Sequence, residues 1–397
     1  MKNTCYIFML FIIFSCNDNG QKTDPFVEIT PVEVDKNKSS SITECIDKIE
    51  VFPLETDSIS IFSIYKKVVY CHELEMFIVL DQELTVSLFS EDGMFIANSR
   101  SKQGQGPGEY LTIVDVVYNP FLKTIELLDP YGSIYRYDTS FQFVEKISLH
   151  QSELVFMRFA PFGVNQYILN PVVFFVTDAV VYFCDYDKNT ISKPISYESD
   201  FISTVTMNMN SFFIQNGTIF LSPLGFDYNF YQIDTNEQTL SPIIQLDFGK
   251  KNVQKKEIKN MFEYPDKTSI TDTAEDMESN MKKMGKINDY LLNSDYPLPI
   301  VKFFNDQYVY VHILAKHKRS GFIYNRKTKE GFLQAEDSSF KMYPCFDIHD
   351  NILIAMVPSY ELDRYVDKQY MNQENLVKLE KVEEEEEDYI IVKYYLK

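Results

Sequence analysis

An ungapped internal repeat constrains the fold of this chain more than any other feature of its sequence. The segment Val68-Val69-Tyr70 recurs as Val116-Val117-Tyr118, and at the same offset Leu80-Asp81 recurs as Leu128-Asp129. Each copy contains four short apolar runs separated by turn residues, such as Glu91-Asp92-Gly93. One four-stranded antiparallel sheet per roughly 40 to 50 residues is typical of a propeller blade. The repeat therefore predicts a β-propeller.

The rest of the chain repeats this pattern of apolar runs and turn residues less regularly. The first copy predicts strands at residues 68–70, 77–80, 86–89 and 95–98. Further blades are expected at residues 156–196, 211–248 and 300–333, with a sixth beginning near residue 343. Residues 49–54 and 389–395 have strand-like patterns near the two chain ends, and either can complete the sixth blade and cover its edge. The sequence thus predicts an all-β, six-bladed β-propeller of four-stranded antiparallel blades, with five or seven blades as alternatives.

Composition and charge further limit the fold class and the kind of partner. The chain contains 27 Tyr and 32 Phe, residues that are enriched in strands. Its net charge of −20 argues against a nucleic-acid partner, because phosphate-backbone binding depends on clustered Lys and Arg. Such acidity chiefly favours solubility.

One segment, at about residues 250–295, breaks the strand rhythm and predicts a helical insertion after the fourth blade. Met277, Met281, Met284 and Leu291 recur at helical spacing and are expected on one face, packed against the propeller. Asp272 and Glu275 resemble an N-terminal capping arrangement. A lid over the central channel, or a docking helix for a partner, is the alternative role.

The N-terminus has the pattern of an export signal. Lys2 precedes an apolar run at residues 6–14 that is too short to span a membrane and ends at Ser15-Cys16. We expect a signal peptide at residues 1–15, lipidation of Cys16, a flexible tether at residues 16–43, and a single propeller domain at residues 44–397. Two acyl chains would hold such a protein stably on a bilayer, with no contact to the membrane except through this anchor.

The remaining cysteines suggest neither a metal site nor a defined disulfide pattern. They stand far apart, without CxxC spacing, at Cys45, Cys71, Cys184 and Cys345. Disulfides are permitted in an exported protein, but single buried thiols are at least as plausible an arrangement.

A glycine-rich string between the first two blades carries a family resemblance. The segment from Lys102 to Tyr110, KQGQGPGEY, resembles the six-bladed β-propeller lipoproteins of Bacteroidetes and, more distantly, the NHL-repeat propellers. This resemblance implies a propeller fold and a location in the bacterial cell envelope, as an outer-membrane lipoprotein facing either the periplasm or the cell surface. It implies no common reaction, although members are often associated with glycan utilisation.

The same string separates structural residues from candidate binding residues. The structural set, expected to form the crossing loop with Glu109 accepting from backbone amides, is Gly104, Gly106, Pro107, Gly108 and Glu109. The crossing loop and the loop between the second and third strands emerge on the same face of a blade. The candidate binding residues on that face are Arg100, Lys102, Gln103, Gln105, Asp81, Asp129 and Tyr131.

Other possible sites are better explained as ordinary structure. His312 and His317 are expected on opposite faces, so a shared metal is disfavoured. The run Asp347-Ile348-His349-Asp350 brings acidic and imidazole groups together, but Asp350-Asn351 fits an ordinary hairpin turn. The run Glu383 to Asp388 is expected to be a solvated loop. Calcium-loop, HExxH, GxSxG and P-loop motifs do not occur in the sequence, and we expect no cofactor.

Two functional classes remain open. The first is a non-catalytic envelope propeller that binds or scaffolds a protein, peptide or glycan. The second is a propeller-type carbohydrate-active hydrolase or lyase, which would need paired carboxylates converging on the channel. Binding is favoured because Val68, Val116 and Phe156, at the starts of the expected inner strands, are apolar. The absence of Trp weighs against sugar stacking, although Tyr can replace it.

Overall fold

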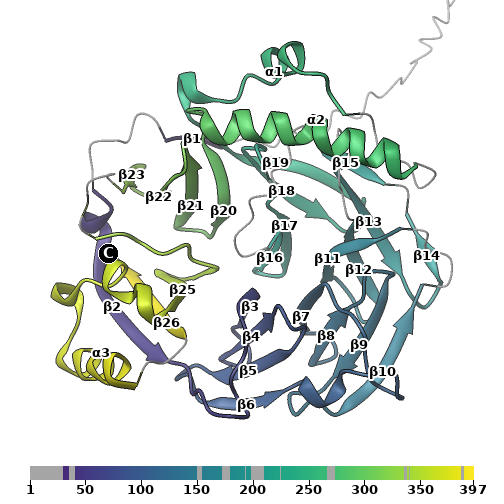
Figure 1. The fold of residues 1–397 in the computed structure, drawn as a ribbon, viewed down its shortest axis with the longest axis horizontal. Helices are drawn as coiled ribbons and strands as arrows, with labels where there is room; N and C mark the ends of the chain where they lie inside the picture. The colour runs from purple at the N-terminus through teal and green to yellow at the C-terminus, as the bar shows by residue number, and fades with distance from the viewer. Residues whose placement is uncertain are drawn as a thin grey trace, which may run out of the picture.

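The strands form several antiparallel sheets around a central space (Figure 1). The computed structural model describes residues 30–34, 41–149, 154–171, 179–192, 194–197, 210–223, 225–265, 273–334, 338, 340–385 and 389–397. Six sheets are formed by these residues, and in each sheet the strands lie side by side from the centre outward. The expected signal peptide and Cys16 lie outside the described residues.

The two copies of the repeat form the first two sheets, and all of the predicted strands are confirmed. The first sheet consists of β3 (Tyr65–Cys71), β4 (Met76–Asp81), β5 (Val86–Ser90) and β6 (Phe95–Asn98). After a short 3-10 helix, η2 (Arg100–Lys102), the second consists of β7 (Asp115–Asn119), β8 (Thr124–Leu128), β9 (Ser133–Tyr137) and β10 (Phe143–Ser148). Apolar side chains of the two sheets, such as Leu88 and Val116, pack together in the seam between them.

The third, fourth and fifth sheets also fall where the sequence predicts blades. The third holds β11 (Phe156–Pro161), β12 (Gln166–Pro171), β13 (Ala179–Asp185), β14 (Thr190–Ile191) and β15 (Ile195–Tyr197). The fourth holds β16 (Phe212–Gln215), β17 (Thr218–Leu221), β18 (Asn229–Asp234) and β19 (Thr239–Asp247). The fifth holds β20 (Leu298–Phe304), β21 (Tyr308–Ala315), β22 (Lys318–Asn325) and β23 (Glu330–Leu333).

An additional strand lies within the segment expected to be a tether. β1 (Thr30–Glu33) pairs in parallel with β19, so the prediction of a flexible tether is wrong for these residues. Val32 of this strand is buried, so pairing with β19 removes an apolar side chain from water. A 3-10 helix, η1 (Ile42–Cys45), follows and is capped by Ser41.

The sixth sheet joins the two ends of the chain. Its order is β2 (Ile46–Pro53), β26 (Tyr389–Leu396), β25 (Ile352–Pro358) and β24 (Asp347–His349). β2 and β26 run antiparallel, with Val51 opposite Val392. The two strand-like segments therefore both complete this sheet, and the outer strands that the sequence left undefined are β26 and β2.

A helical excursion separates β25 from β26 and corrects one prediction. It contains η4 (Ser359–Arg364), η5 (Lys368–Tyr370) and α3 (Gln373–Glu385). The acidic run beginning at Glu383 was expected to be a solvated loop, but α3 continues through Glu385, and residues 386–388 lie outside the described residues. Leu379 and Val382 lie three residues apart on the buried face of this helix, which packs on β2.

The helical insertion after the fourth sheet is confirmed. It contains η3 (Gly249–Lys251), α1 (Lys255–Met261) and α2 (Ala274–Asn293). The capping pair is one residue later than predicted: Thr273 is the N-cap, and its side chain accepts from the backbone N of Asp276. Glu275 is therefore not the capping partner, and Asp272 lies outside the described residues.

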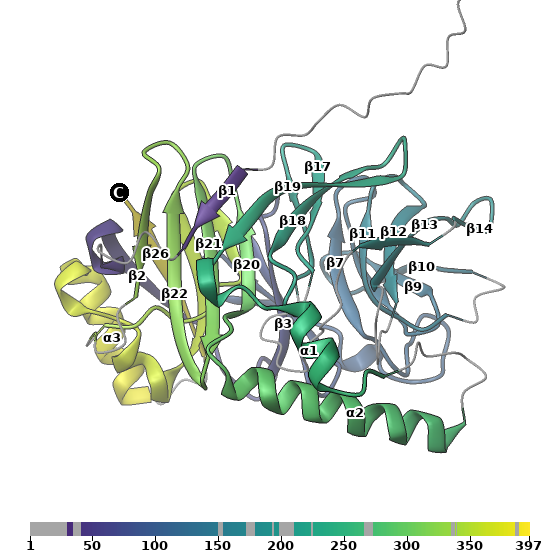
Figure 2. The ribbon, with the colours of Figure 1, turned by 90° about the horizontal axis from the view of Figure 1, so that it is seen from above.

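Only half of the expected methionine stripe of α2 is buried. Met284 and Leu291 pack against the fourth and fifth sheets, whereas the side chains of Met277 and Met281 are 39% and 55% exposed. Figures 1 and 2 show α2 along the outer edge of the molecule. Its C-terminal end lies beside the β21–β22 turn, where His317 Nε2 is 3.0 Å from Asn293 Oδ1. A lid over the channel is therefore excluded by the position of α2, and a docking role stays a prediction.

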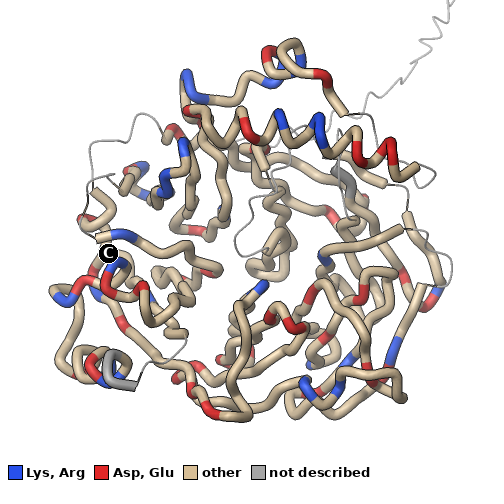
Figure 3. The backbone as a smooth tube through the Cα atoms, viewed as in Figure 1, with Lys and Arg blue, Asp and Glu red and all other residues tan. Residues whose placement is uncertain are grey.

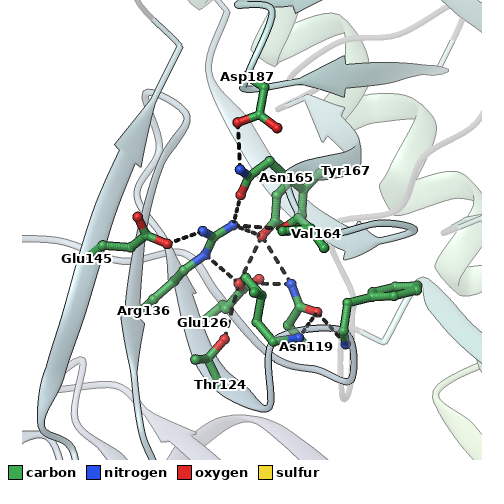
Figure 4. A network of polar contacts seen from close by, with 11 residues as sticks. Asn119, Thr124, Glu126, Arg136, Glu145, Val164, Asn165, Tyr167 and Asp187 are labelled. Carbon is green, nitrogen blue, oxygen red and sulfur yellow. Dashed lines mark hydrogen bonds and ion pairs between the residues drawn. The ribbon is translucent and has the colours of Figure 1, made fainter.

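A buried polar network joins the second and third sheets (Figure 4). Arg136 on β9 donates to Glu126 Oε1 at 2.8 Å and to the hydroxyl of Tyr167 at 2.7 Å. Tyr167 in turn donates to Glu126 at 2.9 Å, and Asn165 Oδ1 accepts from Arg136 at 2.7 Å. The guanidinium thus provides the counter-charge for a fully buried carboxylate.

Replacing Arg136 with Met should lower the free energy of unfolding by about 3–5 kcal/mol, because the buried Glu126 charge would lose its partner. Chemical denaturation followed by tyrosine fluorescence measures this. Arg364→Met, an exposed control, should stay within about 0.5 kcal/mol of the native protein. A loss for Arg136→Met no larger than that of the control would contradict the assigned role.

Candidate functional site

A cavity of about 930 Å³ occupies the centre of the molecule. Residues from the innermost strand of each of the six sheets line it, namely from β3, β7, β11, β16, β20 and β24. The lining also includes residues of the turns that follow these strands, such as His72, Pro120, Asn216, Asp306 and Asp350. The cavity therefore opens at the face that carries the turns between the first and second strands.

This opening lies on the face opposite to the predicted binding surface. Arg100 and Lys102 belong to η2, beyond the outermost strand of the first sheet. Gln103 Nε2 donates to the carbonyl of Glu83 in the β4–β5 turn at 3.0 Å, as expected for loops that share a face. The candidate residues at positions 81, 100, 102, 103, 105, 129 and 131 are absent from the cavity lining. Their role in binding stays a prediction.

Two carboxylates of that predicted surface hold turns together. Asp81 Oδ1 accepts from the backbone N of Thr85 at 2.8 Å, and its side chain is buried. Asp129 Oδ1 accepts from the backbone N of Tyr131 at 2.8 Å and from that of Ser133 at 3.0 Å. The Tyr131 side chain is 66% exposed and remains available on the surface.

The glycine-rich crossing loop has the structural role that the sequence predicts for Glu109. Glu109 Oε2 accepts from the backbone N of Gly106 at 2.8 Å. A Cβ atom on Gly104 would stand 2.1 Å from this carboxylate oxygen. Gly108 has a φ of +74° and lies against the ring of Phe143, so a side chain would be both strained and obstructed there. Pro107 is exposed in the same loop.

A buried charged cluster lies at the deep end of the cavity. Lys67 Nζ is 2.6 Å from Asp115 Oδ1, and Asp115 Oδ2 accepts from the backbone N of Phe159 at 3.0 Å. Arg158 completes the cluster and donates to the carbonyl of Val114 at 3.3 Å. All three charged side chains are buried and line the cavity. Three successive sheets thus contribute two cations and one carboxylate.

Irregular pairing at the start of two inner strands directs side chains of the cluster into the cavity. Lys67 on β3 and Arg158 on β11 both directly follow a shift in strand register, and such bulges re-aim the next side chain. Lys67 stands four residues before the end of β3, which corresponds to about 13 Å along an extended strand. The cluster therefore lies well below the turns that surround the opening.

Burial governs the ionisation of the cluster. It lowers the pKa of Lys67, the Asp115 carboxylate opposes that effect, and the charge of Arg158 adds to it. Burial also lowers the pKa of Arg158, again opposed by Asp115. Both cations thus sit where an additional negative charge would be favourable.

The rim of the cavity carries a histidine pair between the first and sixth sheets. His72 Nε2 is 2.9 Å from Asp347 Oδ2, and the rings of His72 and His349 stack with centroids 4.2 Å apart. Tyr70 contacts His72 edge-on at 4.7 Å. Asp350 has a φ of +48°, and the hairpin turn predicted at Asp350-Asn351 is confirmed as the β24–β25 connection.

Asn210 connects three sheets across the channel. Its side-chain amide donates to the carbonyl of Val68 at 2.9 Å and approaches that of Phe346 at 3.4 Å. Asn210, Phe303 and Phe346 line both the large cavity and a second one of about 20 Å³. Asn210 therefore stands between two separate cavities within the channel.

Sequence reasoning missed the charged cluster, although the repeat contained the signal. Lys67 and Asp115 are separated by 48 residues, the repeat offset, and both immediately precede the Val-Val-Tyr segment. A prediction that places the strand starts at the apolar Val68 and Val116 leaves out the charged residue before each of them. Arg158 likewise stands two positions after Phe156.

The remaining candidate groups do not gather into a site. His312 is buried, which lowers its pKa to about 3, whereas His317 lies in the exposed β21–β22 turn. In the part of the chain that is described, His, Cys, Asp and Glu form no group of three or more suited to a metal ion. Cys45, Cys71, Cys184 and Cys345 are free, buried thiols, and burial raises the pKa of Cys45 and Cys184 to about 12.

Charges of both signs are distributed around the ring (Figure 3). The strongly acidic composition is therefore not concentrated on one sheet of the described chain. No described helix is both long enough and apolar enough to cross a bilayer.

The sheets and the central cavity define a propeller-like β fold. More specifically, the chain belongs to the family described as Domain of unknown function (DUF4934), whose model matches residues 26–395. A crystal structure of a Bacteroides fragilis NCTC 9343 protein, described as a candidate exported protein, is similar with a TM-score of 0.69 and 14% identity. The match covers 93% of this chain and 100% of that one.

More distant structural matches include two WD40 domains. The WD40 β-propeller domain of Doa1 has a TM-score of 0.31 and 12% identity, over 45% of this chain and 53% of that one. The Neurospora crassa Pan2 WD40 domain has a TM-score of 0.34 and 9% identity, over 68% and 65%. No curated protein sequence matches the chain.

The rim histidine provides a pH-dependent prediction. Burial alone would lower the pKa of His72, but the hydrogen bond to Asp347 and the charges of Asp347 and Asp350 raise it above 6.5. The stabilisation from this pair is complete below pH 6.5 and is lost as the pH rises through the folded-state pKa. NMR titration should show a raised pKa in the native protein and a pKa below 6.5 in Asp347→Asn, where burial meets little opposition.

Asp350→Asn is the matched control, because it removes only a longer-range charge. It should lower the pKa of His72 less than Asp347→Asn does. Equal pKa values in the native protein and Asp347→Asn would contradict the assigned pairing.

Proposed function

We propose that this protein is a six-bladed β-propeller lipoprotein of the bacterial envelope that binds a small ligand in its central cavity without catalysing a reaction. One observation carries the proposal: the innermost strands of all six sheets line a single cavity of about 930 Å³. This volume falls within the range of small-molecule sites, roughly 300–1,000 Å³. A short peptide or glycan segment suits such a cavity better than a folded protein does.

The side chains on the cavity wall support binding. Apolar rings contributed by several sheets, including those of Phe159, Phe303 and Phe346, provide contact area, and charged groups at the two ends provide orientation. Both oxygens of Asp115 are engaged, by Lys67 and by a backbone amide. A carboxylate held in this way is poorly suited to the paired-carboxylate chemistry of a glycosidase.

Filling the cavity should abolish binding. Val117 lines the cavity and is the repeat partner of Val69, so Val117→Trp places an indole in the ligand volume. In a ligand-observed NMR screen of short peptides, oligosaccharides and aromatic fragments, the affinity of every hit should fall at least about tenfold in this variant. Val144→Trp, at a position 53% exposed on β10, is the matched control and should bind as the native protein does.

The same screen compares the two faces. Joint replacement of Arg100 and Lys102 by Ala alters the predicted surface opposite the opening and should leave the hits unchanged. Hits that survive Val117→Trp but disappear in the double Ala variant would contradict the cavity proposal and favour that surface.

Membrane attachment is proposed to depend on Cys16. The apolar run followed by Ser15-Cys16 supports lipidation, and the structurally similar Bacteroides fragilis protein is itself described as a candidate exported protein. Cys16→Ala should move the protein from the detergent phase to the aqueous phase in detergent partitioning, because no acyl chains would be attached. Cys5→Ala, in the expected signal peptide, should leave the partitioning unchanged. Detergent-phase partitioning of Cys16→Ala would contradict the anchor.

A further inference from the structure

The cationic groups at the deep end of the cavity suggest the chemical class of the ligand. Lys67 and Arg158 come from the first and third sheets and flank Asp115 on the second. We infer that this cluster is a subsite for an oxyanion, the carboxylate or phosphate of a small ligand. The inference rests on the proposed function, since it assigns the orientation of a ligand within the same cavity.

Burial makes the cluster sensitive to charge. A charged group removed from water is costly unless a partner compensates it; Lys67 is paired with Asp115, and the charge of Arg158 acts on both of these groups. The ammonium of Lys67 has three donors, so it can retain its bond to Asp115 and donate to a second oxyanion. A ligand oxyanion would counter the burial and the Arg158 charge that both disfavour the charged form of Lys67.

The rest of the cavity supports one orientation. Charges of both signs line the opening, where Glu73, Asp306, Asp347 and Asp350 lie with Lys327 and Lys397. The opening therefore has mixed charge, whereas the cluster offers two cationic donors about 13 Å deeper along the inner strand. Between the two ends, rings such as Phe303 and Phe346 offer an apolar wall. The ligand therefore places its anionic end inward and its apolar body along the wall.

Three small probes test this assignment in the full-length protein. Phenylacetate and phenylacetamide share a shape and differ in charge, and phenyl phosphate distinguishes a phosphate subsite from a carboxylate subsite. By ligand-observed NMR, the better of the two anions should bind about tenfold or more tightly than phenylacetamide, as expected for a hydrogen bond to a charged group. Which anion binds more tightly identifies the oxyanion.

Two variants should change the affinity ratio of the anions to phenylacetamide in opposite directions. Lys67→Met removes one cation and should reduce the preference to about twofold or less, whereas Asp115→Asn removes the competing carboxylate and should increase it several-fold. Simple unfolding would abolish binding in both variants, so opposite shifts identify a charge effect. Lys282→Met on α2, where the side chain is 71% exposed, is the matched control and should change nothing.

The outcomes separate this inference from the proposed function. Probe binding that is lost in Val117→Trp but does not distinguish the anions from phenylacetamide would overturn the oxyanion subsite alone. Probe binding that survives Val117→Trp would place the probes outside the cavity and overturn both proposals. A preference that remains intact in Lys67→Met would also overturn the subsite.

Discussion

The architecture depends on hydrogen bonding between two strands from opposite ends of the chain. β2 and β26 are separated by more than three hundred residues in sequence, yet they pair antiparallel in one sheet with β25 and β24. This pairing covers strand edges that would otherwise be exposed and brings the sixth sheet beside the first. The cavity needs all six inner strands, so the site exists only after the most distant parts of the sequence have met.

Much of the fold was accessible from the sequence because local patterns determine it. The repeat predicted eight strands of the first two sheets, since apolar alternation and turn residues are local properties. α3 was missed because Leu379 and Val382 are embedded in a strongly charged segment, where the apolar face is narrow. β1 was missed because its partner is β19, more than two hundred residues away, and a short isolated strand has no local signature.

The candidate site was harder to predict because it is a product of spatial convergence. Lys67, Asp115 and Arg158 are unremarkable residues individually, and only the arrangement of three successive sheets brings them together. The conspicuous glycine-rich string lies on the opposite face, where Glu109 and the glycines satisfy the geometry of a crossing loop. A distinctive motif can thus mark a difficult turn, while the chemistry is distributed over ordinary positions in the repeat.

Asn210 lies at the boundary between the large cavity and the small one. Its amide joins the carbonyls of Val68 and Phe346, and its side chain lines both cavities, so a hydrogen-bonded side chain forms part of the base of the large cavity. A ligand in the large cavity would meet the histidine pair at the rim and the charged cluster at the base. Residues at one end can therefore change during evolution while the contacts at the other end are kept.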